Sequence, residues 1–271
     1  MKESDKYIGV FDSGIGGLTV VKSIIDDIPG ENIIYFGDTA HVPYGTRSKQ
    51  QITEYVMNDV RFLNTFSIKA IVIACNTADS AAKAEVEKNY PDIPIFGVVE
   101  PASEKAAKIT KNNRIGVIAT NATIRSKAYE KAIKKYNPDA LVFSVACPLL
   151  VPLVEEGRFK TDDPVIREVV EEYLAPLKEK EVDTLVLGCT HYPLLHDVIS
   201  AFIGDKTKII SSSAAAAEHL KTELAKLNLL NSGEKKPGKY FVSDNAEFFE
   251  QKANMFMGDS LDGKVEQVNI E

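Results

Sequence analysis

The sequence predicts an α/β protein built from two similar parallel-sheet domains that face a shared interdomain cleft. Short runs of β-branched and other apolar residues alternate along the chain with helix-length amphipathic segments, a pattern typical of parallel sheets covered by helices. The chain has 271 residues, enough for two domains of about 100–150 residues each. Two pairs of strand-like segments also resemble each other in the same order, which favours a duplicated unit.

The expected strands are short, and several are almost wholly apolar, as strands are when helices cover both faces of a sheet. In chain order they are residues 7–11, 32–36, 70–74, 95–98, 114–119, 140–145, 184–188, 208–210 and 240–242. Apolar residues recurring at helical spacing predict helices between them. These are residues 49–66, 123–136, 163–180, 214–227 and 247–257.

The internal repeat lies in strands and in the polar residues that follow them. Residues 8–13 (IGVFDS) resemble residues 115–120 (IGVIAT), and residues 70–77 (AIVIACNT) resemble residues 184–191 (TLVLGCTH). A single match could arise by chance, but two matches in the same order favour duplication. The first unit would then end near Pro101 and the second near Ser213.

Composition excludes several classes of protein. The chain is 44% hydrophobic and 26% charged with a formal net charge of −7, which argues against nucleic acid or an anionic membrane as the main partner. The charged N-terminus contains no apolar signal-peptide core. The longest apolar run, residues 145–154, holds two prolines and is shorter than the roughly 20 residues that a membrane span needs. We therefore expect a cytoplasmic protein with no membrane partner.

The three cysteines divide into a pair and a remainder. Cys75 and Cys189 follow strands at equivalent positions of the two repeats, and ligands of parallel α/β sheets bind beyond the carboxyl ends of strands. Cys147 lies inside an apolar run, and we interpret it as a packing residue. A disulfide framework is not expected in a large cytosolic chain.

Two thiols on opposite sides of a cleft suit proton transfer at both faces of one carbon. A thiolate can remove a proton while the opposite thiol returns one, which inverts the carbon centre. Inert burial is the alternative, since buried cysteine is common, but the paired placement favours the chemical interpretation. His191, two residues after Cys189, could orient or activate that thiol.

The loop DSGIGG, residues 12–17, follows a strand and opens a helix. Its glycines allow close backbone approach to a carboxylate or phosphate. Thr19 replaces the third glycine of the dinucleotide-binding fingerprint, and no Lys-Ser or Lys-Thr completes a phosphate-binding P-loop. Cys75, Cys189 and His191 lack the close spacing of zinc ligands, so no metal site is expected.

Several separate motifs now resemble one family, the cofactor-independent glutamate racemases. The resemblance runs nearly end to end, and every motif position agrees with the family pattern. The motifs are GVFDSGIGGLT (residues 9–19), DTAHVPYG (38–45), ACNTA (74–78), VPLVEEG (151–157) and GCTHYPLL (188–195).

This resemblance implies roles for individual residues. Cys75 would act on D-glutamate and Cys189 on L-glutamate, with the acid Asp12 near the first thiol and with Glu155 and His191 near the second. The implied substrate contacts follow the same motifs. They are Asp12, Ser13, Tyr44, Gly45, Asn76, Thr77, Thr190 and His191, with Thr120 and Thr123 as additions.

The resemblance also implies a metabolic role, an oligomeric state and a domain organisation. It predicts D-glutamate supply for bacterial peptidoglycan, no cofactor, a homodimer, and a C-terminal segment that returns to the first domain. The domains would then be residues 1–98 with 213–271, and residues 99–212. Without an N-terminal extension, activation by a cell-wall precursor is not expected. Two alternatives stay open: an aspartate racemase of the same superfamily, and a non-catalytic protein of two domains that binds a small molecule or nucleotide.

Overall fold

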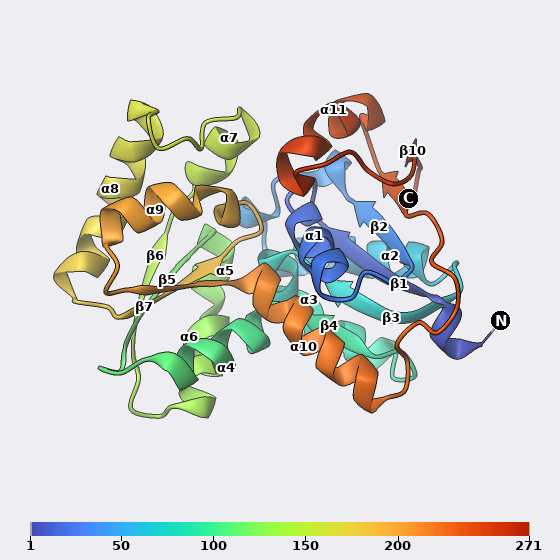
Figure 1. Cartoon of the computed structure of the whole chain (residues 1–271), viewed down its shortest axis with the longest axis horizontal. Coiled ribbons are helices and arrows are strands. Elements are labelled where there is room, and N and C mark those ends of the chain that lie inside the picture. Colours follow the sequence, from blue (N-terminus) through green and yellow to red (C-terminus); the bar gives the residue numbers. More distant parts are fainter. Residues whose placement is uncertain (1, 271) are drawn as a thin grey trace.

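The computed structural model describes residues 2–270 and contains two parallel sheets side by side (Figure 1). The first sheet has the order β10-β9-β2-β1-β3-β4, and all its neighbouring strands run parallel. Its strands are β1 (Tyr7–Asp12), β2 (Ile33–Gly37), β3 (Ile68–Ile73), β4 (Ile95–Gly97), β9 (Lys239–Val242) and β10 (Val265–Gln267).

The second sheet repeats the central order of the first. Its order is β6-β5-β7-β8, again parallel throughout, so β5 and β7 correspond to β1 and β3. Its strands are β5 (Arg114–Ala119), β6 (Leu141–Ala146), β7 (Thr184–Gly188) and β8 (Lys208–Ser211). The predicted fold class is therefore confirmed, and the strands that resemble each other in sequence occupy equivalent places. The exact domain boundaries stay a prediction.

Helices cover both sheets (Figure 1). They are α1 (Leu18–Asp27), α2 (Lys49–Leu63), α3 (Asn76–Asn89), α4 (Val99–Ile109), α5 (Asn121–Ser126), α6 (Ala128–Tyr136), α7 (Leu150–Glu155), α8 (Pro164–Glu179), α9 (His196–Ile203), α10 (Ser212–Lys226) and α11 (Ala246–Met257). Every residue of β2, β3 and β7 is buried, as expected for strands covered on both faces.

One predicted helix is wrong. Residues 123–136 form two helices because Lys127 adopts the left-handed conformation, with φ 56° and ψ 22°, which an α-helix cannot continue through. The Ser126 hydroxyl accepts the backbone N–H of Ala128 at 3.1 Å and so begins the second helix. The three-residue strand β10 was not predicted, because its sequence, Val-Glu-Gln, has only one apolar residue.

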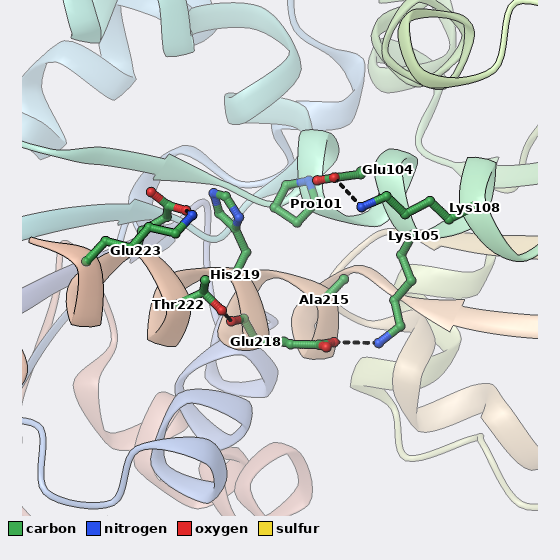
Figure 2. Close-up of a pocket in the computed structure, with 10 residues that line it drawn as sticks. Pro101, Glu104, Lys105, Lys108, Ala215, Glu218, His219, Thr222 and Glu223 are labelled. Carbon is green, nitrogen blue, oxygen red and sulfur yellow. Dashed lines mark hydrogen bonds and ion pairs between the residues drawn. The ribbon is translucent and has the colours of Figure 1, made fainter.

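Two helices lie where the chain passes between the sheets. Helix α4 leads from β4 to β5, and α10 follows β8 and packs on α1. A groove of about 420 Å³ lies between α4 and α10 (Figure 2). Its charges pair with one another: Lys105 contacts Glu218 across the groove at 2.6 Å, and Lys108 contacts Glu104 at 2.6 Å. The pair between Lys105 and Glu218 joins the two connecting helices, whereas the pair between Lys108 and Glu104 lies within α4.

A buried ion pair connects two segments to the first sheet: the N-terminal segment that precedes β1 and the segment that follows α10. The Lys69 ammonium on β3 lies 2.6 Å from Glu31 Oε2 and donates to the backbone carbonyls of Ser4 and Leu229 at 2.6 and 2.7 Å. The two carbonyls accept hydrogen bonds from the ammonium, and the nearby Glu31 carboxylate balances its charge. The two charged side chains are 0% and 3% exposed.

Replacing this lysine should destabilise the protein. Lys69→Met leaves the Glu31 carboxylate buried without its cation, which costs about 3 kcal/mol of unfolding free energy, and the urea midpoint should fall. Lys22→Met, which breaks an exposed pair with Asp26, should cost less than about 1 kcal/mol. Equal losses in the two variants would contradict the role assigned to Lys69.

Among residues 2–270, no helix combines the length and the apolar character that crossing a bilayer requires.

Candidate active site

A cavity of about 380 Å³ lies at the carboxyl ends of strands from both sheets. Phe11 pairs with Ile73 in the first sheet and Ala119 with Gly188 in the second, so the residues that follow these strands emerge at one edge of each sheet. Eleven of the residues singled out from sequence line this cavity. They are Ser13, Tyr44, Gly45, Cys75, Asn76, Thr77, Thr120, Glu155, Cys189, Thr190 and His191.

Cys75 lies at the N-terminus of α3, where its sulfur accepts the backbone N–H of Ala78 at 3.5 Å. The thiol also points to the Ser13 hydroxyl, 3.6 Å away. Burial, reinforced by the negative charge of Asp12, raises the pKa of Cys75 to about 12, in spite of the helix N-terminus. Cys75 is therefore a protonated thiol at neutral pH, ready to donate a proton.

Cys189 begins a hydrogen-bonded chain of three side chains. Its Sγ lies 3.8 Å from His191 Nδ1, and His191 Nε2 lies 2.9 Å from Glu155 Oε1. Burial works to lower the pKa of His191, but the contacts with Cys189 and Glu155 outweigh it and raise that pKa to about 10. The imidazole is therefore a cation at neutral pH, and it can stabilise negative charge on the adjacent sulfur.

The C-terminal helix α11 supports this chain from the first sheet. The ring of Phe256 meets the His191 ring edge-on, with centroids 5.4 Å apart. Lys252 donates to the backbone carbonyl of Glu155 at 2.8 Å. Both contacts fix the orientation of groups behind Cys189.

Asp12 lies behind the cavity wall, close to both sides of the site. Its carboxylate accepts the backbone N–H of Gly14 at 3.0 Å and lies 3.5 Å from the Thr190 hydroxyl. Burial raises the pKa of Asp12 and outweighs the opposing effect of the His191 charge. Asp12 therefore links the glycine-rich loop to the strand end that carries Cys189.

Three threonine hydroxyls close the cleft between the two units. Thr77 lies 2.8 Å from Thr120 and 3.2 Å from Thr123, and Thr120 lies 3.0 Å from Thr123. Thr77 belongs to the first turn of α3 and Thr120 caps α5. The N-termini of two helices thus meet here, an arrangement that favours an anionic ligand.

The side-chain polar atoms of Asn76 and Tyr44 are hydrogen-bonded to other side chains of the protein. The Asn76 amide accepts the Tyr129 hydroxyl at 2.5 Å and donates to Ser212 at 3.4 Å. Tyr44 donates its hydroxyl to Asp38 at 2.5 Å, so this hydroxyl is engaged below the cavity wall. A Cβ added at Gly45 would come within 3.0 Å of Thr120 Cβ, which shows how closely this turn approaches the second unit.

Comparison with known proteins bears on the same residues. A family model described as Asp/Glu/Hydantoin racemase matches residues 8–220. The chain belongs to this family.

Within the Asp/Glu/hydantoin racemase family, the chain is similar over nearly its full length to glutamate racemases. It is 48% identical to the glutamate racemase of Geobacter metallireducens, over 98% of this chain and 97% of that protein. The solved structure of a Bacillus anthracis glutamate racemase isoform has a TM-score of 0.94 at 39% identity, covering 98% of each chain. That of a Francisella tularensis glutamate racemase in complex with D-glutamate has a TM-score of 0.92 at 37% identity, covering 99% of each. A Picrophilus torridus aspartate racemase, at 19% identity and a TM-score of 0.56, shares the fold alone.

Two of the residues expected at the site do not line the cavity. Asp12 and Thr123 lie one layer behind, each bonded to residues that do line it. The wall also contains residues that were not named as substrate contacts. Gly14 belongs to the glycine-rich loop, and the quoted motifs contain Val42, Pro43, Val151 and Pro152, whereas sequence reasoning missed Thr46, Asn121 and Pro148. Asn121 directly follows Thr120 at a strand end, a signal that could have identified it. Thr46 and Pro148 have no such signal.

Cys147 is separate from the cavity. It is fully buried, and its thiol points to the backbone carbonyl of Val145 at 3.7 Å. Burial raises its pKa well above the ordinary range. Among residues 2–270, no three His, Cys, Asp or Glu side chains gather as a metal ion would require. The expectation of a metal-free and cofactor-free site stays a prediction.

Gly16 is the glycine whose replacement should disturb the site most. A Cβ there would lie 2.4 Å from Thr190 Oγ1 and 2.5 Å from His191 Nδ1. Gly16→Ala should displace the strand end that carries Cys189 and lower kcat/KM by about 10²-fold. Gly30→Ala, where nothing lies within 4 Å of the added carbon, should leave kcat/KM unchanged. Full activity in Gly16→Ala would refute this packing argument.

Proposed function

We propose that this chain interconverts L- and D-glutamate by transferring protons between the substrate Cα and two thiols. The observation that carries the proposal is that Cys75 and Cys189 line one cavity from the ends of two different sheets. A substrate between them would have one thiol on each face of its Cα. Removal of a proton on one face and delivery on the other inverts that centre.

The two thiols have different surroundings, and this difference indicates which one removes a proton from L-glutamate and which one donates a proton. With His191 as a cation 3.8 Å from its sulfur, Cys189 is the side suited to act as thiolate. It takes the Cα proton of L-glutamate, and the C–H electron pair passes into the adjacent carboxylate group. The Cys75 S–H bond then breaks and gives its proton to the opposite face, which forms D-glutamate. The reverse reaction begins from a Cys75 thiolate and a Cys189 thiol.

Neutral donors would hold the anionic substrate. No lysine or arginine is among the described residues that line the cavity, although the substrate carries two carboxylates. Ser13, Asn76, Thr77 and Thr190 supply hydroxyl and amide groups, and the helix N-termini supply backbone N–H groups. Such fixed dipoles also stabilise the negative charge that develops on the substrate during proton removal.

Glutamate is the substrate favoured by the comparisons. The relatives named glutamate racemase exceed 40% identity over nearly the whole chain, whereas the aspartate racemase shares the fold alone. We further propose supply of D-glutamate for peptidoglycan, a cytoplasmic location and a homodimer, in line with the family. The division into domains 1–98 with 213–271 and 99–212 belongs to the same proposal.

The test is a racemisation assay without added cofactor. Purified protein should convert L-glutamate into D-glutamate, seen as decay of optical rotation, and pyridoxal phosphate should not be needed. L-Aspartate in a parallel assay should react far more slowly. Absence of racemisation of either amino acid, or dependence on pyridoxal phosphate, would refute the proposed function.

A further inference from the structure

A buried group of three side chains lies beneath the cavity wall that Tyr44 forms. The Tyr44 hydroxyl lies 2.5 Å from Asp38 Oδ2 and 3.2 Å from Asp59 Oδ2. Asp38 follows β2 and Asp59 belongs to α2. Each of the three residues is at most 1% exposed. Two carboxyl groups therefore share one phenol in a site closed to solvent.

The count of protons in this group decides its charge. A phenol has one proton, and the shorter contact, to Asp38, takes it. Asp38 Oδ1 is also within reach of Ser243 Oγ and of His41 Nδ1, each at 2.8 Å, which is a donor set typical of an ionised carboxylate. The contact between Tyr44 and Asp59 can then be a hydrogen bond only if Asp59 is the donor.

The electrostatic environment agrees with this assignment. Burial, together with the nearby charge of Asp38, raises the pKa of Asp59 well above its ordinary range, although the Tyr44 hydroxyl works in the opposite direction. The second oxygen of Asp59, Oδ1, is buried and has no hydrogen-bond partner among the described residues. Leaving a buried oxygen unbonded costs much more free energy in an ionised carboxylate than in a neutral acid.

We propose that Asp59 is a positioning residue that acts as a neutral carboxylic acid, donating to Tyr44 while Tyr44 donates to Asp38. These two hydrogen bonds point the same way, from Asp59 to Tyr44 and from Tyr44 to Asp38, and they fix both the hydroxyl and the ring of Tyr44. Tyr44 opens the 3₁₀ turn Tyr44–Thr46, whose three residues all line the cavity. Asp59 thus sets the position of this wall without touching the substrate.

Loss of the hydrogen bond from Asp59 should change KM more than kcat, because Asp59 positions the cavity wall and contacts neither thiol. This prediction rests on the proposed function, because glutamate racemisation provides the rate. Asp59→Leu removes the donor and should raise KM for glutamate about tenfold while kcat changes less than about threefold. Asp59→Asn supplies an amide N–H in place of the acid O–H and should keep KM within about twofold of wild type.

Tyr44→Phe removes the other partner of the contact between Asp59 and Tyr44, and it tests the proposal if Asp59→Leu does not fold. It removes the hydroxyl but keeps the ring, so it should raise KM as Asp59→Leu does. Combined, the two changes should raise KM no further than either alone. Equal KM values in Asp59→Asn and Asp59→Leu would overturn the proposal, as would additive effects of Asp59→Leu and Tyr44→Phe.

Infrared spectroscopy tests the neutral acid without using activity. At mildly alkaline pH, wild-type protein should show the carbonyl band of a protonated carboxylic acid, and Asp59→Asn should lose it. Asp79→Asn is the matched control, because Asp79 is also buried but its pKa of about 6 leaves it ionised there. A band as intense in Asp59→Asn as in wild type would overturn the proposal. A wild-type protein that does not racemise glutamate would refute the proposed function, while the infrared result would still decide the state of Asp59.

Discussion

Replacing either Cys75 or Cys189 by alanine should lower kcat for glutamate racemisation by about 10³- to 10⁴-fold. Each thiol handles the proton on one face of the substrate, and alanine has no group that can replace it. Because inversion needs both faces, loss of one thiol stops the reaction in both directions. Polarimetry with each enantiomer as substrate provides the measurement.

Cys147→Ala is the matched control for these two variants. Cys147 is buried like the other two cysteines but does not line the cavity, so its replacement should change kcat less than about threefold. Circular dichroism would establish that all three variants fold. Strong loss at Cys147 with activity retained at Cys75 or Cys189 would overturn the assignment of the thiols.

His191→Asn should lower kcat/KM by about 10²-fold, and by the same factor in both directions. The reason for the loss is charge: the pKa of about 10 keeps His191 protonated at neutral pH, and asparagine cannot carry that charge beside Cys189. The factor must be equal because L- and D-glutamate have the same free energy in water. Initial rates with each enantiomer at low concentration give the two values.

The pH profile provides a second readout of the same substitution. The pKa of His191 is raised above its ordinary value, so the cation persists through neutral pH and is lost as pH rises through about 10. Wild-type kcat/KM should therefore fall in that alkaline range more steeply than loss of the substrate's own ammonium proton requires, and His191→Asn should lack the additional fall. His196→Asn, at an exposed histidine, should behave as wild type. An unchanged kcat/KM in His191→Asn would contradict the role of the imidazolium.

The positions of most strands and the strand-end residues could be predicted because they depend on local pattern. Apolar runs between amphipathic segments identify buried parallel strands, and the carboxyl ends of such strands must share one edge. Cys75 and Cys189 therefore converge on one cavity, as the repeated sequence indicated. The break at Lys127 and the strand β10 depend on a single backbone conformation and on tertiary pairing, which leave no periodic signal.

Other parts of the site depend on contacts between segments distant in the sequence. Phe256 and Lys252 belong to an ordinary amphipathic helix, and their contacts with His191 and Glu155 follow only from where α11 packs. Asp59 lies on the buried face of α2 among apolar residues, and its contact with Tyr44 needs the turn after β2. Sequence pattern identifies polar residues at strand ends, but not those that reach the site through packing.

Isotope labelling tests the two-thiol account most directly. L-Glutamate should be incubated with the protein in deuterated water, and both enantiomers should be separated and analysed at early times. The account predicts that D-glutamate carries deuterium at Cα from its first appearance, while the remaining L-glutamate carries almost none, because different groups remove and deliver the proton. Deuterium appearing in L-glutamate as fast as D-glutamate forms, or D-glutamate formed without deuterium, would contradict it.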